Sequence, residues 1–355
     1  MAMDTSAESQ QQVVAQAKET LRSDNDFRNT IFTVIGLMVG LLAFGLITTI
    51  AAGDDLGSFG LILVSGLFQG MLLFLVASGM SIVFGLMDVL NLAQGAYFTI
   101  GAYVAWQVHH ADALAAVPPD LRFVLALLSA TAVGAILGII LERGLLQPLY
   151  ARPIFQIVLT FGLAIVFGEI IKFIWGTAAY QWIEPFSLQQ GSFTIFDQQF
   201  STYRLFVIFV GFVFIGTIAL LLQRTRIGII IRAGVEDSEM VEALGINVRL
   251  VFTAIFTLGC ALAALGGGVA APFLGASLGV GQGFLLGAIA VVVLGGLGSY
   301  EGTAVGSVLV GLAIAIVAKF SAEFLNQTVW SSLTPMLLLV LVLLLRPAGL
   351  FGKER

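Results

Sequence analysis

The sequence predicts an all-α, polytopic membrane protein with about eight to ten transmembrane helices. Hydrophobic residues make up 59% of the 355 positions, more than a soluble domain of this length can bury. Long runs such as LMVGLLAFGLITTI and PMLLLVLVLLL contain no charged residue and no regular alternation of polar and apolar positions. Because the strands of a membrane β-barrel require that alternation, helices are the predicted spanning elements.

Ten segments are apolar enough to be spans. We expect them at about 31–52, 60–85, 89–107, 122–141, 154–175, 204–222, 251–274, 282–297, 303–319 and 331–346. Eight full crossings are the alternative, if the short segments 89–107, 282–297 and 303–319 are re-entrant or broken. Ten spans divide into two halves of five, and an odd number per half inverts the second half relative to the first.

The ends of the chain are predicted to be cytoplasmic. Residues 1–30 are polar and lack the apolar core of a signal peptide, so we expect a tail that precedes a transmembrane domain at 31–350. With the N-terminus inside, the inside segments 1–30, 142–153, 223–250 and 346–355 hold three, two, four and three of the 16 basic residues. The other four (Arg122, Lys172, Arg204 and Lys319) lie at or near the outer ends of spans. This asymmetry predicts the orientation.

The residue content excludes several classes of function. Cys260 is the only cysteine, which excludes an intramolecular disulfide and a multi-cysteine metal site. No G-x-x-x-x-G-K-[ST] loop, nucleophile elbow or HExxH motif occurs, so we expect neither enzymatic activity nor a bound cofactor in this chain. The net charge of −5 does not indicate a nucleic-acid-binding protein, because such proteins carry basic surfaces. His109 and His110 fall in a predicted outside loop, where we expect them in solvent.

Two glycine-rich segments with scattered polar residues occupy comparable places in the two halves, at 85–103 and 279–302. Paired segments of this kind point to a central pathway between repeats. Polar side chains that face lipid carry a desolvation cost, so we expect these to face the path or a neighbouring helix. Hydrogen bonding between helices is the alternative role for any single one. The residues assigned to the path are Asp88, Asn91, Gln94, Gly95, Tyr97, Thr99, Gln282 and Gly283.

Other spacings predict packing and ion pairs. Four glycines recur every four residues, at Gly275, Gly279, Gly283 and Gly287, and would form a smooth packing stripe on a continuous helix, although Gly281 interrupts the pattern. Glu169 with Lys172, and Lys319 with Glu323, have the helical spacing of ion pairs. An ion-coupled secondary transporter is the competing class, and its coupling carboxylates would be Asp88 and Glu169.

The polar loop Gln223–Leu250 carries four basic and four acidic residues in a chain that is only 10% charged. Its segment EDSEMVEAL (236–244) predicts a short amphipathic helix that ends at Gly245, with Met240, Val241 and Leu244 on the apolar side. Such a helix can dock in a groove of a soluble protein. The alternative is a helix that rests on lipid, but interfacial helices favour basic faces and this one is acidic.

Four stretches, in this order, resemble the branched-chain amino acid ABC importer permeases of the LivH type. They are NLAQGAYFTIGAYVA after position 90, ERGLLQPLYARP (142–153) with LTFGLAIVFGEII behind it, RTRIGIIIRAGVEDSEMVEALGIN (224–247), and VVVLGGLGSYEGTAVGSVLVGL (291–312). The resemblance covers about residues 60–350, and separate motifs in the right order make it specific. One position departs from it, because Gln94 stands where the family commonly has His.

The resemblance implies an inner-membrane permease subunit that works by alternating access. Its implied partners are a second permease subunit, two ATPase subunits that hold the ATP and magnesium, and a periplasmic solute-binding protein. Glu242, Ala243 and Gly245 partly match the family's EAA…G coupling loop, and the ATPase-coupling residues assigned here are these three with Arg232, Asp237 and Asn247. The implied substrates are branched-chain or related amino acids, with urea or short amides as the alternative that close relatives carry.

Overall fold

The computed structural model describes residues 28, 30–150, 152–195, 198–226, 228–230, 233 and 238–352. Within these ranges one apolar helix matches each of the ten predicted spans. The first is Thr30–Ala51, and the others are α2 (Leu56–Met87), α3 (Gln94–His109), α4 (Pro119–Leu141), α5 (Pro153–Trp175), α7 (Thr202–Arg224), α10 (Val248–Leu274), α11 (Val280–Gly295), α12 (Tyr300–Phe324) and α13 (Val329–Leu345). Seven of them are long and apolar enough to cross a membrane, whereas α3, α11 and α13 are shorter, with 16, 16 and 17 residues. The predicted all-α, polytopic membrane fold is confirmed.

Short elements occupy the connections. They are η1 (Asp112–Leu114), η2 (Glu142–Leu146), η3 (Gln147–Leu149), α6 (Ser187–Gln190), β1 (Ser192–Ile195), β2 (Gln198–Ser201) and α9 (Ser238–Ala243). The strands β1 and β2 pair antiparallel, with Ser192 opposite Ser201. This hairpin lies between α5 and α7, in a connection for which no strand was predicted.

Helices α2 and α10 form the centre of the bundle. Residues 70–83 of α2 and 259–272 of α10 are buried without interruption. Helix α12 packs along α2, while α3 and α4 pack along α10. Small residues permit the close approach: a Cβ added at Gly101 of α3 would lie 1.9 Å from the carbonyl oxygen of Ala264 on α10.

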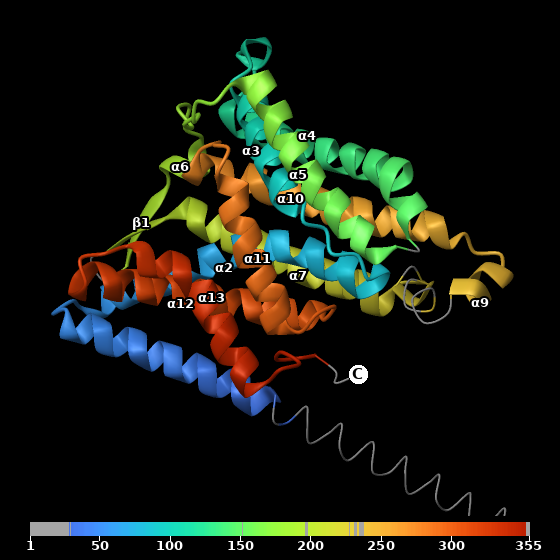
Figure 1. Ribbon diagram of the computed structural model, residues 1–355. Helices are drawn as coiled ribbons and strands as arrows, with labels where there is room; N and C mark the ends of the chain where they lie inside the picture. The colour runs from blue at the N-terminus through green and yellow to red at the C-terminus, as the bar shows by residue number, and fades with distance from the viewer. Residues whose placement is uncertain are drawn as a thin grey trace, which may run out of the picture.

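The two halves of the chain have corresponding parts. Helix α2 ends at Asp88 (φ 53°) and α10 ends at Gly275 (φ 73°), and after each comes an irregular stretch followed by a 16-residue helix, α3 or α11. Helix α3 packs on α10, and α11 packs on α2; Figure 1 shows α11 running steeply across α2. Each half therefore places its short helix against the long helix of the other half. The expectation that 303–319 is a short segment is wrong, because α12 has 25 residues.

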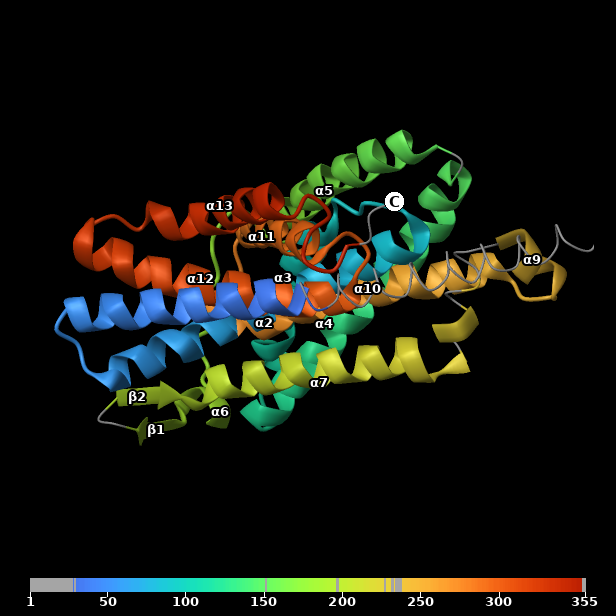
Figure 2. The same cartoon turned by 90° about the horizontal axis from the view of Figure 1, so that it is seen from below.

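The long helices run side by side, and the connections gather at the two ends of the bundle (Figure 2). At one end the backbones of Tyr180 and Ala276 pair, and Lys319 binds Asp54 at 2.6 Å. At the other end Arg346 donates to Thr30, and the N–H of Leu350 donates to Leu294 at 2.8 Å. Helix α9 extends beyond this second end in both views. Both ends of the described chain thus share the face of α9, and which face is cytoplasmic stays a prediction.

Candidate functional site

The irregular stretch between α2 and α3 lies deep in the bundle and is closed by its own polar side chains. Asn91 accepts from the N–H of Ala93 at 3.0 Å and donates to the Oε1 of Gln94 at 3.1 Å. The Nε2 of Gln94 donates to the carbonyl of Gly259 on α10 at 2.7 Å. Both side chains are completely buried. The chain of hydrogen bonds satisfies polar groups that lipid would leave unpaired, and it ties the start of α3 to the middle of α10.

The space for this network comes from two glycines. A Cβ added at Gly79 of α2 would lie 2.3 Å from the Nε2 of Gln94 and 2.5 Å from the carbonyl oxygen of Gly259. A Cβ at Gly259 would in turn lie 2.9 Å from the carbonyl oxygen of Gly79. Helices α2 and α10 therefore cross with backbone almost touching backbone, and the amide of Gln94 fills the gap beside that crossing.

The other predicted path residues face different neighbours. Tyr97 is buried with its ring 5.6 Å from that of Phe167 on α5. Thr99 donates to the carbonyl of Gly95 in its own helix at 3.1 Å, and its hydroxyl lies where α3 meets Gly281 of α11. Gly95 itself forms the backbone contact with Gly281.

Three assigned residues lie on the surface of the chain. Asp88 caps the end of α2 with its side chain exposed, and Gln282 and Gly283 are exposed on α11. Single-chain geometry thus divides the assigned residues into a buried group and an exposed group. The assignment of both groups to one path stays a prediction.

The expected glycine stripe is wrong in register. Gly275 ends α10 and Gly279 precedes α11, so the four glycines do not share a continuous helix. Gly283 has no neighbouring atom within 4 Å of an added Cβ, whereas Gly281 would place its Cβ 1.9 Å from the carbonyl oxygen of Gly95. The residue that seemed to interrupt the stripe is the one that makes the close contact.

In the predicted coupling loop, Gln223–Leu250, one helix ends at a glycine and the next begins at a capping asparagine. The predicted short helix is present as α9, and Gly245 (φ 83°) ends it by donating its N–H to Glu242 at 2.9 Å. The side chain of Asn247 then accepts from the N–H of Leu250 at 3.1 Å and caps α10. Arg232 and Asp237 lie outside the described residues.

Around α9, most of the side chains whose exposure the structure describes are exposed. Val241 is 2% exposed and anchors the helix, while Met240 and Leu244 are 54% and 71% exposed. Glu242, Ala243 and Gly245 are also exposed. Met240 and Leu244 thus leave apolar surface exposed beside the acidic Glu242, and docking of a soluble partner on this surface stays a prediction.

A buried carboxylate lies near this loop. Glu142, the first residue of the predicted inside segment 142–153, is completely buried at the π-helical turn η2. It accepts from the hydroxyl of Tyr150 and from that of Thr253 on α10 at 2.6 Å. Burial and the neighbouring Glu142 raise the pKa of Tyr150, so its hydroxyl stays a donor. The only sequence signal was a charged residue placed directly after the apolar run of α4.

The predicted ion pairs are present. Lys172 binds Glu169 at 2.6 Å with both side chains largely exposed, and Lys319 binds Glu323 at 3.3 Å as well as Asp54. Glu169 therefore sits in a surface pair rather than in a buried relay, and Asp88 is exposed. Among the described residues, no group of three His, Cys, Asp or Glu could hold a metal ion.

These features define the class as a multi-pass helical membrane protein with two corresponding halves and a short, exposed helix beyond one end of the bundle. The family model of the branched-chain amino acid transport system permease component matches residues 62–343. The chain belongs to this family. No solved structure gives a significant match.

Curated relatives match along most of their length. The high-affinity branched-chain amino acid transport system permease protein BraD of Pseudomonas aeruginosa is 30% identical over 300 residues, which cover 82% of this chain and 95% of BraD. LivH of Escherichia coli is 27% identical over 295 residues, 81% of this chain and 94% of LivH. A probable LivH of Methanocaldococcus jannaschii is 26% identical over 321 residues, 84% and 94% of the two chains. The expected family is confirmed.

Proposed function

We propose that this chain is the permease subunit of an ABC importer for branched-chain amino acids in the bacterial inner membrane, with both termini and α9 in the cytoplasm. ATP hydrolysis belongs to partner ATPases, a second permease subunit completes the translocation path, and a periplasmic binding protein delivers the substrate. Membership of the family supports the transport role. The excess of Lys and Arg on the α9 side supports the orientation.

The observation that carries the mechanism is the direct connection from α9 to the centre of the bundle. Only Leu244–Asn247 separate α9 from α10, and Asn247 caps α10 with its side chain. Eleven residues into that helix, Gly259 accepts the hydrogen bond of Gln94. A push on α9 is therefore transmitted along one continuous helix to the start of α3. In the proposed cycle, closure of the ATPases shifts α10 and tilts α3 and α11 around the path.

The path residues of this proposal fall into the two groups described above. The exposed Gln282 and Gly283 on α11 face the partner permease, and the buried Asn91 and Gln94 set the position of α3. Because Gln94 bonds as an amide and does not titrate near neutral pH, transport by this chain does not depend on protonation at that position.

Two matched glycines test the coupling. Gly245 beside α9 and Gly53 at the opposite end both have positive φ (83° and 77°), and neither has a neighbouring atom within 4 Å of an added Cβ. Each donates its N–H to the residue three positions earlier, at 2.9 and 3.0 Å. Proline is incompatible with that φ and removes the donor at either site. The two substitutions are therefore alike except for the face on which they lie.

We expect Gly245→Pro to abolish leucine uptake and co-purification of the ATPase while Gly53→Pro retains both, at equal amounts of chain in the membrane. The measurements are radiolabelled leucine uptake in cells that lack their own branched-chain permeases, and affinity purification in mild detergent. Normal uptake with Gly245→Pro contradicts the coupling role of α9. Absence of leucine uptake by the wild-type system contradicts the assignment of substrate.

A further inference from the structure

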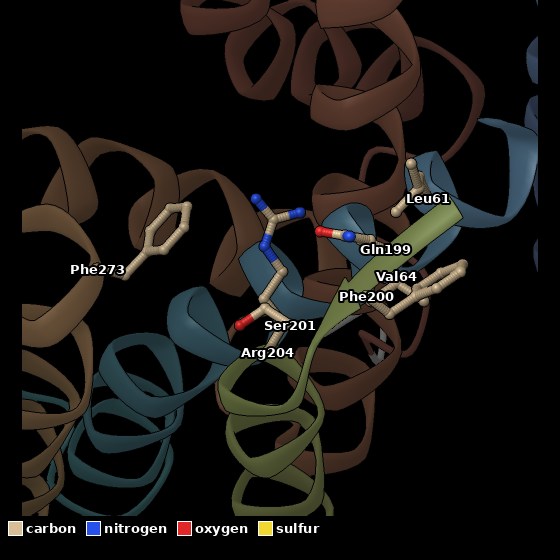
Figure 3. A pocket seen from close by; sticks show the side chains of 7 residues that line it. All are labelled: Leu61, Val64, Gln199, Phe200, Ser201, Arg204 and Phe273. Carbon is tan, nitrogen blue, oxygen red and sulfur yellow. The ribbon is translucent and has the colours of Figure 1, made fainter. Parts of the chain in front are cut away.

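Arg204 points into a cavity at the end of the bundle opposite α9 (Figure 3). The cavity has a volume of about 300 Å³ and lies between the outer ends of α2, α7 and α10 and strand β2. This volume is at the lower end of small-ligand sites, large enough for one small molecule. From the sequence, Arg204 was expected only to reach the membrane surface.

The guanidinium of Arg204 is held in place by its neighbours, and several of its N–H donors stay available to a ligand. It donates to the hydroxyl of Ser65 at 2.7 Å and lies 5.1 Å from the ring centroid of Phe273 and 5.9 Å from that of Phe68. No carboxylate pairs with it among the residues that the structure describes. A guanidinium has five N–H donors in a planar fork that fits a carboxylate, so most of its capacity faces the cavity.

The position of Arg204 in the chain strengthens this assignment. It is in the first turn of α7, where the helix dipole is positive and a basic residue is unfavourable. Both the dipole and the guanidinium attract an anion to the same place. An anion in the cavity would thus offset the repulsion between the guanidinium and the positive end of the helix dipole.

The other residues that line the cavity determine which chemical groups the anionic ligand can carry. Leu61, Val64 and Phe200 supply apolar surface, and the side-chain amide of Gln199 lies across from Phe273 with the guanidinium between them. The amide oxygen of Gln199 suits an ammonium group, whereas the ring of Phe273 already faces the guanidinium. The cavity therefore offers a carboxylate partner, an ammonium partner and an aliphatic wall within one small volume.

We propose that this cavity is a reception site for an aliphatic α-amino acid, with its carboxylate on Arg204, its ammonium beside Gln199 and its side chain against Leu61 and Val64. The site deepens the proposed function and rests on it for the identity of the ligand. It places substrate recognition at the mouth opposite α9, before the crossing of α2, α3 and α10.

The test uses the purified full chain in nanodiscs of phosphatidylcholine, with saturation-transfer NMR of L-leucine. L-leucinol, which keeps the side chain and the amine but lacks the carboxylate, is the matched ligand. Arg204→Gln removes the positive charge from the cavity. Leu61→Trp fills the cavity and leaves that charge in place. Arg249→Gln is the control, because it removes an exposed arginine at the opposite face. We expect leucine affinity to fall about tenfold or more with Arg204→Gln and with Leu61→Trp, and to be unchanged with Arg249→Gln. L-leucinol should bind the wild type as weakly as leucine binds Arg204→Gln.

Each other outcome has a defined meaning. Equal leucine affinity in wild type and Arg204→Gln, or no leucine signal at all, overturns the site. Co-purification of phosphatidylglycerol with the wild type but not with Arg204→Gln, without leucine binding, overturns it in favour of a lipid headgroup. Normal leucine uptake without Arg204-dependent binding rejects this site and leaves the proposed function intact. Arg204-dependent leucine binding without uptake by the complete transporter rejects the proposed function and leaves the site.

Discussion

Replacing Gly101 by alanine should loosen the packing of α3 on α10. The added Cβ would lie 1.9 Å from the carbonyl oxygen of Ala264, 2.5 Å from its carbonyl carbon and 2.6 Å from its Cα. All three are backbone atoms, so no side chain can rotate away. Ordinary contact begins at 3.4 Å, and α3 must therefore move away from α10 by about 1.5 Å at this point. Overpacking of this kind costs about 1–3 kcal/mol.

The matched control is Gly168→Ala on α5, where an added Cβ has no neighbouring atom within 4 Å. Alanine there removes only the conformational entropy of a helical glycine and should be neutral or stabilising by about 0.5–1 kcal/mol. In a thermal unfolding assay in detergent, followed by the loss of the monodisperse chromatographic peak, we expect Gly101→Ala to melt at least about 3 °C below the wild type. If Gly101→Ala inserts normally and melts together with Gly168→Ala, the close α3–α10 contact described here is refuted.

Three further sets of substitutions test polar contacts. Glu142→Ala should destabilise the chain by about 1–3 kcal/mol, because it leaves the half-buried hydroxyl of Tyr150 without its acceptor and removes the buried acceptor of Thr253; Glu142→Gln should recover part of that loss, and equal melting of both variants would argue against the contact. Gln94→Ala should lower leucine uptake more than Gln94→Asn does at equal membrane abundance, since only an amide can still donate to the carbonyl of Gly259 and accept from Asn91; identical uptake by the two would exclude a role for the amide. Arg122→Ala and Glu184→Ala should each melt slightly below the wild type, and the double variant no lower than the worse single one, because the 2.6 Å pair is lost once; strictly additive losses would show that the pair is not coupled.

The spans were predictable because lipid imposes a length of apolar sequence, which can be read without knowledge of the neighbours. The ends of the helices were less predictable from the sequence. Span 89–107 begins instead at Gln94, because Asp88 adopts a left-handed conformation and Asn91 closes a polar turn inside the bundle. The tertiary partner of that turn, Gly259, is 165 positions from Gln94. No local pattern reports such a pairing.

The connection between α5 and α7 shows the same limit. His109 was expected in solvent, but it is completely buried, with the ring of Trp182 4.3 Å from its own. The backbone carbonyl of Glu184 lies 3.1 Å from its Nε2, and the carboxylate of Glu184 binds Arg122. The connection between α5 and α7 folds back over the end of α3 and buries His109. The residues next to His109 in the sequence had indicated an exposed position. Loops of this length carry no periodicity from which that return can be inferred.

Helix α10 connects the three places where this chain can respond to its surroundings. At its start, Asn247 follows the exposed helix α9; in its middle, Gly259 holds the amide of Gln94; near its end, Phe273 lies against the guanidinium of Arg204. In the proposed cycle, a shift of α10 along its axis moves α9, the turn before α3 and the wall of the cavity together. Such coupling would be reciprocal, since a ligand that favours one position of α10 must also favour the matching position of α9. In this proposal α10 is the physical route by which occupancy of the cavity alters the surface that α9 offers to a partner.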